Sequence, residues 1–371
     1  MLEVQGLVAE RPNGPSRLSA LQIGPLRADE VLVRIAGVGI CHTDLTALAG
    51  AVPFPFPAVL GHEGSGVVVE VGSAVTTLTP RDPVVLTFDA CGECRTCRSG
   101  RPAYCEVFHA LNRSGTRADG STALRDAQGA VHGGWFGQSS FASYAVATER
   151  NAVRVPHDVP IELVGPLGCG LLTGAGTVVN VLRPESGSHA AVVGCGAVGL
   201  AAVMAFATAG CAHIVAVDTR ADRRALAVEL GATEAIDPAV TPIKGALRAV
   251  GGVDHVVDTV STAEVLDAAV RGLRAPGTVA TVGLRGPRNP VTLDQTLLLG
   301  GRTVTGVIEG DARPHDLVPE LVEQWRAGRF PFDKMITTFP VDAHADAFDA
   351  AATGRVVKPV LTFDQTPKEH S

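Results

Sequence analysis

The sequence is poor in aromatic residues and has no excess of positive charge. Only 4% of its 371 residues are aromatic, and two of these are tryptophans, so a large ring at a particular position is informative. The formal net charge is −7 at pH 7. Binding to a nucleic-acid backbone needs a surplus of lysine and arginine, and we therefore expect no nucleic-acid partner.

The N-terminal segment "MLEVQGLVAE" lacks the basic residues and apolar core of a signal peptide, which predicts a cytoplasmic protein. One apolar segment, residues 190–209, is long enough to cross a bilayer. Its glycines cluster early, and its flanks carry no basic or aromatic anchors. We interpret it as a buried strand, a tight turn and a buried helix, and expect no membrane association.

Two regions differ in their sequence rhythm. Up to about residue 148, short valine-rich runs are broken by glycine and proline, which indicates a mainly antiparallel β unit. Residues 188–308 alternate strand and helix patterns with short connectors, which is typical of a parallel sheet covered by helices on both faces. Two helices and a strand near the C-terminus are expected to return to the first unit. Residues 115–134 are predicted to form a long surface loop.

A glycine motif opens one of the predicted helices. In "VVGCGAVG", Gly194, Gly196 and Gly199 form G-x-G-x-x-G directly after an apolar strand, the arrangement that binds a dinucleotide pyrophosphate. The next strand ends at Asp218, whose carboxylate can accept the ribose hydroxyls of NAD and repel the 2′-phosphate of NADP. Asp218 as a helix N-cap is the alternative. Nearby arginines, Arg223 among them, leave room for NADP.

Four of the eight cysteines crowd into "CGECRTCRSGRPAYC", at Cys91, Cys94, Cys97 and Cys105. Four thiolates at this spacing can surround Zn²⁺ and leave no open position, which predicts a structural zinc. The bacterial iron–sulfur pattern differs, because its fourth cysteine comes sooner and a proline follows it, whereas Glu106 follows here. Disulfides are disfavoured without a secretory signal.

Other metal-competent side chains are scattered. Cys41 lies in "GICHTDL", His62 and Glu63 lie in "VLGHEGSG", and Cys169 lies in "GPLGCGLLTGAG". If Cys41, His62 and Cys169 converge, they form a three-ligand zinc site with an open fourth position, which is the arrangement of a catalytic metal. Each residue alone is as compatible with a place in the core. The residues themselves leave the convergence open.

These motifs, in this order and over nearly the whole chain, resemble the zinc-dependent medium-chain alcohol dehydrogenases. The "CHTDL", "VLTF", "FGQSSFASYA" and "VIEGD" segments most resemble the aryl-alcohol (benzyl alcohol) dehydrogenase branch. The resemblance implies an α/β fold with a GroES-like, mainly antiparallel β catalytic domain over residues 1–171 and 312–371, and a structural zinc lobe near 88–110. It implies a Rossmann doubly wound parallel sheet over 172–311, and a homodimer or homotetramer associating through the sheet edge near "TVTGVI".

The resemblance assigns the catalytic zinc to Cys41, His62 and Cys169. It implies that Asp44 supports the zinc histidine, an arrangement that orients the ring and raises its basicity. Glu63 matches a carboxylate behind the metal. Together with the four-cysteine loop, this predicts two zinc ions per chain.

Proton transfer and cofactor binding are also implied by position. Thr43 matches the hydroxyl that contacts the alcohol, and Thr46 stands where many relatives end the relay with a histidine. His42 replaces a pyrophosphate-binding arginine, so it could contact phosphate, act as the relay base, or both. The cofactor contacts implied by the resemblance, besides His42, are Gly194, Gly196, Ala197, Val198, Gly199, Asp218, Arg223, Val282 and Lys358.

A large apolar substrate pocket is implied by the same comparison. Trp135 is informative because the chain has so few aromatic residues, although packing beneath the 115–134 loop is an alternative for it. Glu309 is unusual beside such a wall. The implied walls are Val52, Trp135, Phe136, Leu284 and Ile308.

The sequence thus predicts an NAD-dependent zinc enzyme that interconverts a primary, aromatic or bulky apolar alcohol and its aldehyde. One alternative is a thiol-adduct formaldehyde dehydrogenase, for which Arg113 and Arg117 could hold the carboxylates of the adduct. A zinc-free quinone reductase would have no use for Cys41, His62 and Cys169 together. The last alternative is a catalytically idle NAD-binding structural protein, and the complete ligand set argues against it.

Overall fold

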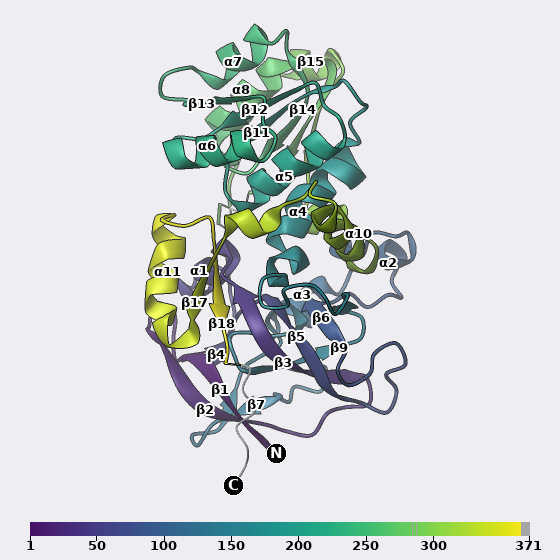
Figure 1. Cartoon of the computed structure of the whole chain (residues 1–371), viewed down its shortest axis with the longest axis vertical. Helices are drawn as coiled ribbons and strands as arrows, with labels where there is room; N and C mark the ends of the chain where they lie inside the picture. Colours follow the sequence, from purple (N-terminus) through teal and green to yellow (C-terminus); the bar gives the residue numbers. More distant parts are fainter. Residues whose placement is uncertain (284, 287, 365–371) are drawn as a thin grey trace. The chain divides into compact units, whose positions relative to one another are not determined.

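The computed structural model describes residues 1–283, 285–286 and 288–364, and the chain divides into two units (Figure 1). The β-rich unit contains Met1–Cys169, Pro314–Pro319 and the described residues from Met335 onward. The parallel-sheet unit contains Gly170–Arg313 and Glu320–Lys334. Within the described residues, no helix is both long and apolar enough to cross a membrane.

Two sheets build the β-rich unit. The first has the antiparallel order β4-β1-β2-β7-β8, and the second has the order β10-β6-β5-β3-β18-β17, with β9 also paired to β3. The strands of the first sheet are β1 (Leu2–Ala9), β2 (Ser16–Ile23), β4 (Ala58–Val59), β7 (Leu124–Arg125) and β8 (Ala130–Val131). Those of the second are β3 (Glu30–Gly39), β5 (Glu63–Val71), β6 (Pro83–Leu86), β9 (Tyr144–Thr148), β10 (Ala152–Arg154), β17 (Ile336–Pro340) and β18 (Lys358–Thr362).

The register of three neighbouring strands positions residues of the candidate active site. Strand β3 is buried at nearly every residue and pairs antiparallel with β5 and with β18. Gly39 at its end lies opposite both Glu63 and Val360. A Cβ atom at Gly39 would come within 2.0 Å of a Glu63 carboxylate oxygen, so only glycine leaves space for that side chain. The end of β3 and the start of β5 therefore meet, with the start of β18 beside them.

The parallel-sheet unit has the strand order β13-β12-β11-β14-β15-β16, and every pairing in it is parallel. Its strands are β11 (His189–Val193), β12 (His213–Val217), β13 (Glu234–Ile236), β14 (Val253–Asp258), β15 (Leu273–Thr281) and β16 (Arg302–Gly306). Residues 190–209 contain most of β11, a turn and the whole of the mostly buried helix α5, as the sequence predicts. The parallel sheet confirms the predicted α/β class.

Short helices connect the strands of both units. Helix α10 contributes residues to each unit, because the division falls at Pro319. The helices are α1 (His42–Leu48), α2 (Arg95–Arg98), α3 (Phe108–Arg113), α4 (Gly170–Gly176), α5 (Ala197–Thr208), α6 (Ala221–Glu229), α7 (Ile243–Ala249), α8 (Ala263–Gly272), α9 (Gln295–Leu299), α10 (Pro314–Arg326) and α11 (His344–Thr353).

The segment predicted as a long surface loop, residues 115–134, contains a small hairpin. Strands β7 and β8 pair with each other, and β7 also extends the first sheet beside β2. The carboxylate of Asp126 accepts hydrogen bonds from the backbone N–H groups of Gln128 and Gly129, which closes the turn. Two-residue strands are too short to show a sequence period, so the pattern could not reveal them.

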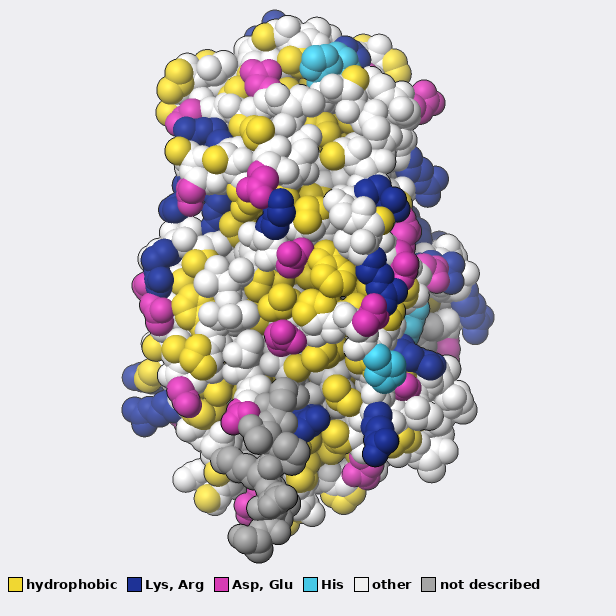
Figure 2. All heavy atoms as spheres, viewed as in Figure 1, with side chains coloured by type: hydrophobic (Ala, Val, Ile, Leu, Met, Phe, Trp, Pro, Cys, Tyr) yellow, Lys and Arg dark blue, Asp and Glu magenta, His cyan; other side chains and the backbone are white. Residues whose placement is uncertain are grey.

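Acidic and basic side chains are interspersed on the face of the molecule shown in Figure 2. Ion pairs between described surface residues include Arg355–Asp346 and Lys334–Glu229. A mixed surface of this kind is ordinary for a protein of modest net negative charge.

Candidate active site

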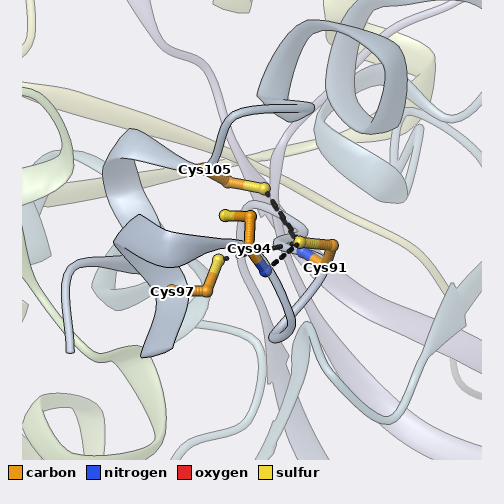
Figure 3. Close-up of side chains that lie close together, drawn as sticks. All are labelled: Cys91, Cys94, Cys97 and Cys105. Atoms are coloured by element: carbon orange, nitrogen blue, oxygen red, sulfur yellow. Dashed lines mark hydrogen bonds between the residues drawn. The ribbon is translucent and has the colours of Figure 1, made fainter. Parts of the chain in front are cut away.

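The four-cysteine loop gathers its thiols in one place (Figure 3). The sulfur atoms of Cys91, Cys94, Cys97 and Cys105 all lie within 4.8 Å of one another, and all four cysteines are free thiols. Cys91 Sγ lies 3.5 Å from Cys105 Sγ and 3.9 Å from Cys97 Sγ. Tetrahedral ligation with Zn–S bonds of about 2.3 Å places sulfurs about 3.8 Å apart. These thiols therefore match the geometry of a closed zinc site.

Backbone N–H groups stabilise negative charge on these sulfurs. Cys91 Sγ accepts from the N–H groups of Glu93 and Cys94, at 3.4 and 3.3 Å. A hydrogen bond with the Thr96 hydroxyl, aided by backbone donors, lowers the pKa of Cys94 to about 5. Burial raises the pKa of Cys97 to about 12. Because metal ligands bind as thiolates, zinc binding here would release protons.

A second group of potential ligands forms where β3, β5 and the segment before α4 meet. The ligand atoms of Cys41, His62, Glu63 and Cys169 lie within 4.8 Å of one another. Cys41 follows β3 and is the N-cap of α1, while His62 directly precedes β5 and Glu63 is its first residue. Cys169 is placed by a close approach of backbones, since a Cβ on Gly168 would lie 2.0 Å from the Leu86 carbonyl oxygen.

One ring nitrogen of His62 is hydrogen-bonded, and the other is buried without a hydrogen-bond partner among the described residues. Nδ1 of His62 lies 2.7 Å from Asp44 Oδ1, and both side chains are fully buried. Nε2 of His62 is buried and makes no hydrogen bond within the described residues. A buried imidazole nitrogen without a partner is costly unless something binds it. Together with two thiols, this orphaned atom fits a zinc ion.

Neighbouring charges and hydrogen bonds shift the pKa values of two of these ligands, Cys41 and His62. A hydrogen bond from Cys169 and the charges of His62 and Lys358 hold the pKa of the Cys41 thiol well below its usual value, despite burial. Burial alone would lower the pKa of His62, but the charges of Asp44 and Cys41 outweigh it and raise the pKa. The lowered pKa favours the thiolate form of Cys41, which is the form that binds metal.

Behind this group lies a buried ion pair. Lys358 Nζ, at the start of β18, donates to both carboxylate oxygens of Glu63 at 2.9 and 2.8 Å and to the Ile40 carbonyl at 3.2 Å. Burial raises the pKa of Glu63, with the Lys358 charge acting against it. The ammonium group of Lys358 is thus turned toward Glu63, and its predicted contact with the pyrophosphate stays a prediction.

The proton-relay candidates occupy the first turns of α1. His42 is exposed and Thr43 is partly buried. The hydroxyl of Thr46 donates to the Thr43 carbonyl at 2.9 Å, so Thr46 closes a helical turn. The exposure of His42 is compatible with either of its predicted roles.

The glycine motif has the form that a pyrophosphate requires. Gly194 has φ of +89°, and its N–H bonds to Val217 at the end of β12. A Cβ on Gly199 would lie 1.9 Å from the Gly194 carbonyl oxygen, whereas a Cβ on Gly196 would meet nothing within 4 Å. Gly194 and Gly199 thus shape the turn, and the space beside Gly196 is open to a ligand. Ala197 and Val198 start α5 and are partly exposed.

Asp218 follows β12, next to this turn. Its carboxylate accepts hydrogen bonds from the backbone N–H groups of Cys195 at 2.7 Å and Arg220 at 2.8 Å. Helix α6 has Arg220 at its N-cap position, so the carboxylate of Asp218 braces the glycine loop more than it caps the helix. The Arg223 side chain is buried, and Val282 N donates to the Asp258 carbonyl at the end of β14.

The predicted pocket residues differ in exposure. Val52, Trp135 and Phe136 belong to the β-rich unit and are buried, with Trp135 0% exposed. Ile308 belongs to the parallel-sheet unit and is 36% exposed. Leu284 lies outside the described residues. These four described positions stay predictions for the substrate wall.

Sequence reasoning missed two contacts of the β-rich unit. The indole Nε1 of Trp135 donates to Asp44 Oδ1 at 2.9 Å, and the side-chain amide of Gln138 donates to the His62 carbonyl at 2.9 Å. Gln138 Oε1 also accepts from Gly64 N at 3.1 Å. The "WFGQSS" segment thus braces the turn that carries His62. Its tryptophan, one of two in the chain, was the available signal.

Comparison with known proteins shows the family to which this chain belongs. The model of the alcohol dehydrogenase GroES-like domain matches residues 27–157, and that of the zinc-binding dehydrogenase family matches residues 197–325. The chain therefore belongs to the zinc-containing medium-chain alcohol dehydrogenases, which combine a GroES-like antiparallel domain with a Rossmann domain. It is an oxidoreductase with two candidate zinc sites.

Individual relatives span nearly the whole chain. A geraniol dehydrogenase from Castellaniella defragrans is 43% identical over 367 residues, which is 98% of each chain. The benzyl alcohol dehydrogenase structure from Acinetobacter calcoaceticus is 39% identical with a TM-score of 0.95, covering 98% of this chain and 100% of that one. A zinc-binding-domain alcohol dehydrogenase from Burkholderia ambifaria is 45% identical with a TM-score of 0.96 and the same coverage.

Proposed function

We propose that this protein is an NAD-dependent zinc alcohol dehydrogenase that interconverts a primary alcohol, aromatic or bulky and apolar, with its aldehyde. The observation that carries the proposal is the group formed by Cys41, His62 and Cys169. Two thiols and a buried imidazole nitrogen without a partner converge there. Three such ligands leave one position of a tetrahedral ion open for substrate.

The residues in and around this group have separate roles in metal binding, ring orientation and proton transfer. Zinc held by Cys41, His62 and Cys169 supplies a Lewis acid that lowers the pKa of an alcohol hydroxyl. Asp44 fixes the Nδ1 side of His62, which directs Nε2 to the ligand group. Thr43 would accept the hydroxyl proton and pass it toward solvent, where the exposed His42 directly precedes Thr43 in α1.

NAD is the proposed hydride acceptor. Its pyrophosphate would occupy the open space beside Gly196, at the start of α5. Asp218 would accept the adenosine ribose hydroxyls, and a buried Arg223 is less suited to a 2′-phosphate than an exposed one. Bound there, NAD would supply the acceptor for the hydride of the carbinol carbon.

Substrate class follows from two lines of support. Geraniol and benzyl alcohol, the substrates in the names of two relatives, are both primary alcohols whose carbinol carbon adjoins an unsaturated carbon. In this chain, Trp135 and Phe136 pack against the His62 ring, and Phe54 packs against Trp135. Such surroundings favour a bulky apolar alcohol over ethanol.

The formaldehyde dehydrogenase alternative has less support. Arg117 donates to both carboxylate oxygens of Glu30 at 2.6 and 2.7 Å, in a mostly buried pair. The guanidinium of Arg113 lies over the Phe136 ring, 5.8 Å from its centroid. Neither arginine is placed as a free charge for the carboxylates of a thiol adduct.

Association through the Rossmann sheet is part of the proposal. Strand β16 ends the sheet order, and within the described residues its outer edge pairs with no strand. Leu298 and Leu299 on the neighbouring α9 are 38% and 78% exposed. Exposed edges and apolar side chains favour pairing with a second copy. We expect a homodimer or homotetramer, measurable by light scattering.

The test is NADH formation from NAD⁺ with benzyl alcohol, geraniol and ethanol in parallel. We expect kcat/KM for the two unsaturated alcohols to exceed that for ethanol by roughly a hundredfold, which is about 2.7 kcal/mol of transition-state preference. Ethanol as the best substrate would reject the substrate class. Absence of any NADH formation by protein that contains two zinc ions per chain would reject the proposed activity.

A further inference from the structure

Trp135 makes a hydrogen bond that a substrate wall does not need. Its indole N–H donates to Asp44 Oδ1 at 2.9 Å, across 91 positions of the sequence. Both residues are 0% exposed. The ring also packs edge-on against Phe54, with 5.0 Å between centroids. Trp135 is thus held by packing on its ring and by a charge-assisted hydrogen bond at its nitrogen.

Asp44 collects donors from separate parts of the fold. Its Oδ1 accepts from His62 Nδ1 at 2.7 Å, Trp135 Nε1 at 2.9 Å and Gly61 N at 3.3 Å. Its Oδ2 accepts from Cys41 N at 3.1 Å. An ionised carboxylate has about four acceptor positions. Three of these donors converge on Oδ1 and one binds Oδ2, so loss of the Trp135 donor would remove one of three bonds that hold Oδ1 in place.

The orientation of the His62 ring depends on this carboxylate. Asp44 binds Nδ1, and Phe136 stacks on the ring with a centroid distance of 4.5 Å and an interplanar angle of 24°. Phe136 adopts a left-handed φ of +51°, directly after Trp135. The same two-residue segment thus contacts His62 on its face and reaches the partner of its Nδ1. Partners of this kind affect metal affinity without touching the metal.

We propose that Trp135 is a positioning residue that fixes the Asp44 carboxylate and, through it, aims His62 Nε2 at the catalytic metal. The inference rests on the proposed function, because it takes His62 as a zinc ligand. It gives Trp135 a part in supporting the metal centre, beyond its predicted place in the substrate wall. Its effect should therefore appear in how tightly zinc is held, even when no alcohol is present.

The chain supplies a matched control. Trp325, the only other tryptophan, donates from its Nε1 to Asp333 Oδ1 at 2.8 Å. The Trp325→Phe variant removes an indole-to-carboxylate hydrogen bond in the parallel-sheet unit by the same substitution. The bond of Trp325 is exposed, whereas that of Trp135 is buried, so Trp325→Phe controls for the chemical change away from the ligand group.

The experiment measures zinc release from the holoenzyme to the chromogenic chelator 4-(2-pyridylazo)resorcinol. Cys41→Ser identifies the phase that belongs to the catalytic ion, because that variant should lack it. We expect Trp135→Phe to accelerate this phase by roughly tenfold, the lower end of the effect of such partners. The other phase should not change, and Trp325→Phe should leave both phases as in the wild type.

A double-mutant comparison tests the route of the effect. If Trp135 acts through Asp44, then Trp135→Phe adds little to the release rate in an Asp44→Ala background. A folded Trp135→Phe variant with wild-type release of both ions, and only a changed KM for benzyl alcohol, would overturn the proposal. Equal acceleration of both phases would also overturn it.

A second measurement leaves Trp135 intact, in case Trp135→Phe does not fold. In the Trp325→Phe protein, Trp135 is the sole tryptophan, so its fluorescence reports on this site alone. Its emission should change during the catalytic phase of zinc release, and emission that changes only with the other phase would contradict the proposal. Failure of the proposed function has a different result, since wild-type protein would then release two zinc ions but form no NADH.

Discussion

The two candidate zinc sites contain similar ligands but are built in opposite ways. Cys91, Cys94, Cys97 and Cys105 come from one short loop, and their sulfurs meet because the backbone turns tightly around them. Cys41, His62 and Cys169 come from segments far apart in the sequence and meet through the register of β3 and β5 and the packing of Gly168. The first site can organise a local lobe, whereas the second depends on the whole β-rich unit being folded.

The largest effect that would test this comparison is on catalysis. We expect Cys41→Ser to lower kcat/KM at least about a thousandfold, which is about 4 kcal/mol, because the alcohol loses its Lewis acid. Zinc content should fall from two ions to one per chain, with little change in Tm. Cys211→Ser is the control, since Cys211 lies in neither ligand group. A Cys41→Ser enzyme with two zinc ions and full activity would remove Cys41 from the site.

The contiguous site should show the reverse pattern. Cys94→Ser should remove the other zinc ion and destabilise the lobe by several kcal/mol, on the order of 10 °C in Tm. The fraction that stays folded should keep a KM for alcohol near the wild-type value. Calorimetry and zinc analysis measure both effects. A wild-type Tm in zinc-free Cys94→Ser protein would show that the ion does not support the fold.

The glycine loop extends the comparison between local and long-range sites. Within this one motif, Gly196 is expected to serve cofactor binding and Gly199 to serve folding. Gly196→Val should raise the KM for NAD roughly 10- to 100-fold, about 1.4 to 2.7 kcal/mol, with an unchanged Tm, since its side chain enters open space. Gly199→Val should lower the Tm, because its Cβ would collide with the Gly194 carbonyl. Steady-state kinetics and thermal melts separate the two, and a destabilised Gly196→Val would refute the distinction.

The smallest expected effect concerns cofactor choice. Asp218→Ser should shift the ratio of kcat/KM values for NAD and NADP toward NADP by about tenfold, because it removes a carboxylate that repels a 2′-phosphate. Part of the loss with NAD should come from the loop itself, since Asp218 also holds Cys195 N. Initial rates with both cofactors measure the shift. An unchanged ratio would leave Asp218 with a purely structural role.

The same division explains how much the sequence could predict. The glycine motif and the four-cysteine loop are contiguous, so spacing alone indicated their chemistry, and periodicity gave the parallel sheet. The convergence of Cys41, His62 and Cys169 was open from the residues, because strand register depends on packing throughout a sheet. The resemblance to a family supplied it.

Long-range side-chain contacts were beyond any sequence pattern. The Lys358–Glu63 pair spans 295 positions and the Trp135–Asp44 bond spans 91. Position in the family suggested a phosphate contact for Lys358 and a substrate wall for Trp135. Neither suggestion predicts that Lys358 binds the buried carboxylate of Glu63 or that Trp135 binds that of Asp44. These contacts depend on which strands and turns are neighbours in space.

Gly39 also carries a lesson for engineering this enzyme. Any replacement at this position would place its Cβ against the Glu63 carboxylate, beside the ligand group. Codon 39 should therefore be kept constant in a library designed to alter alcohol preference, since variants there would be lost before selection for a new substrate could act. Diversity is better directed to Val52 and Ile308, which are predicted to line the pocket and do not hold the metal ligands.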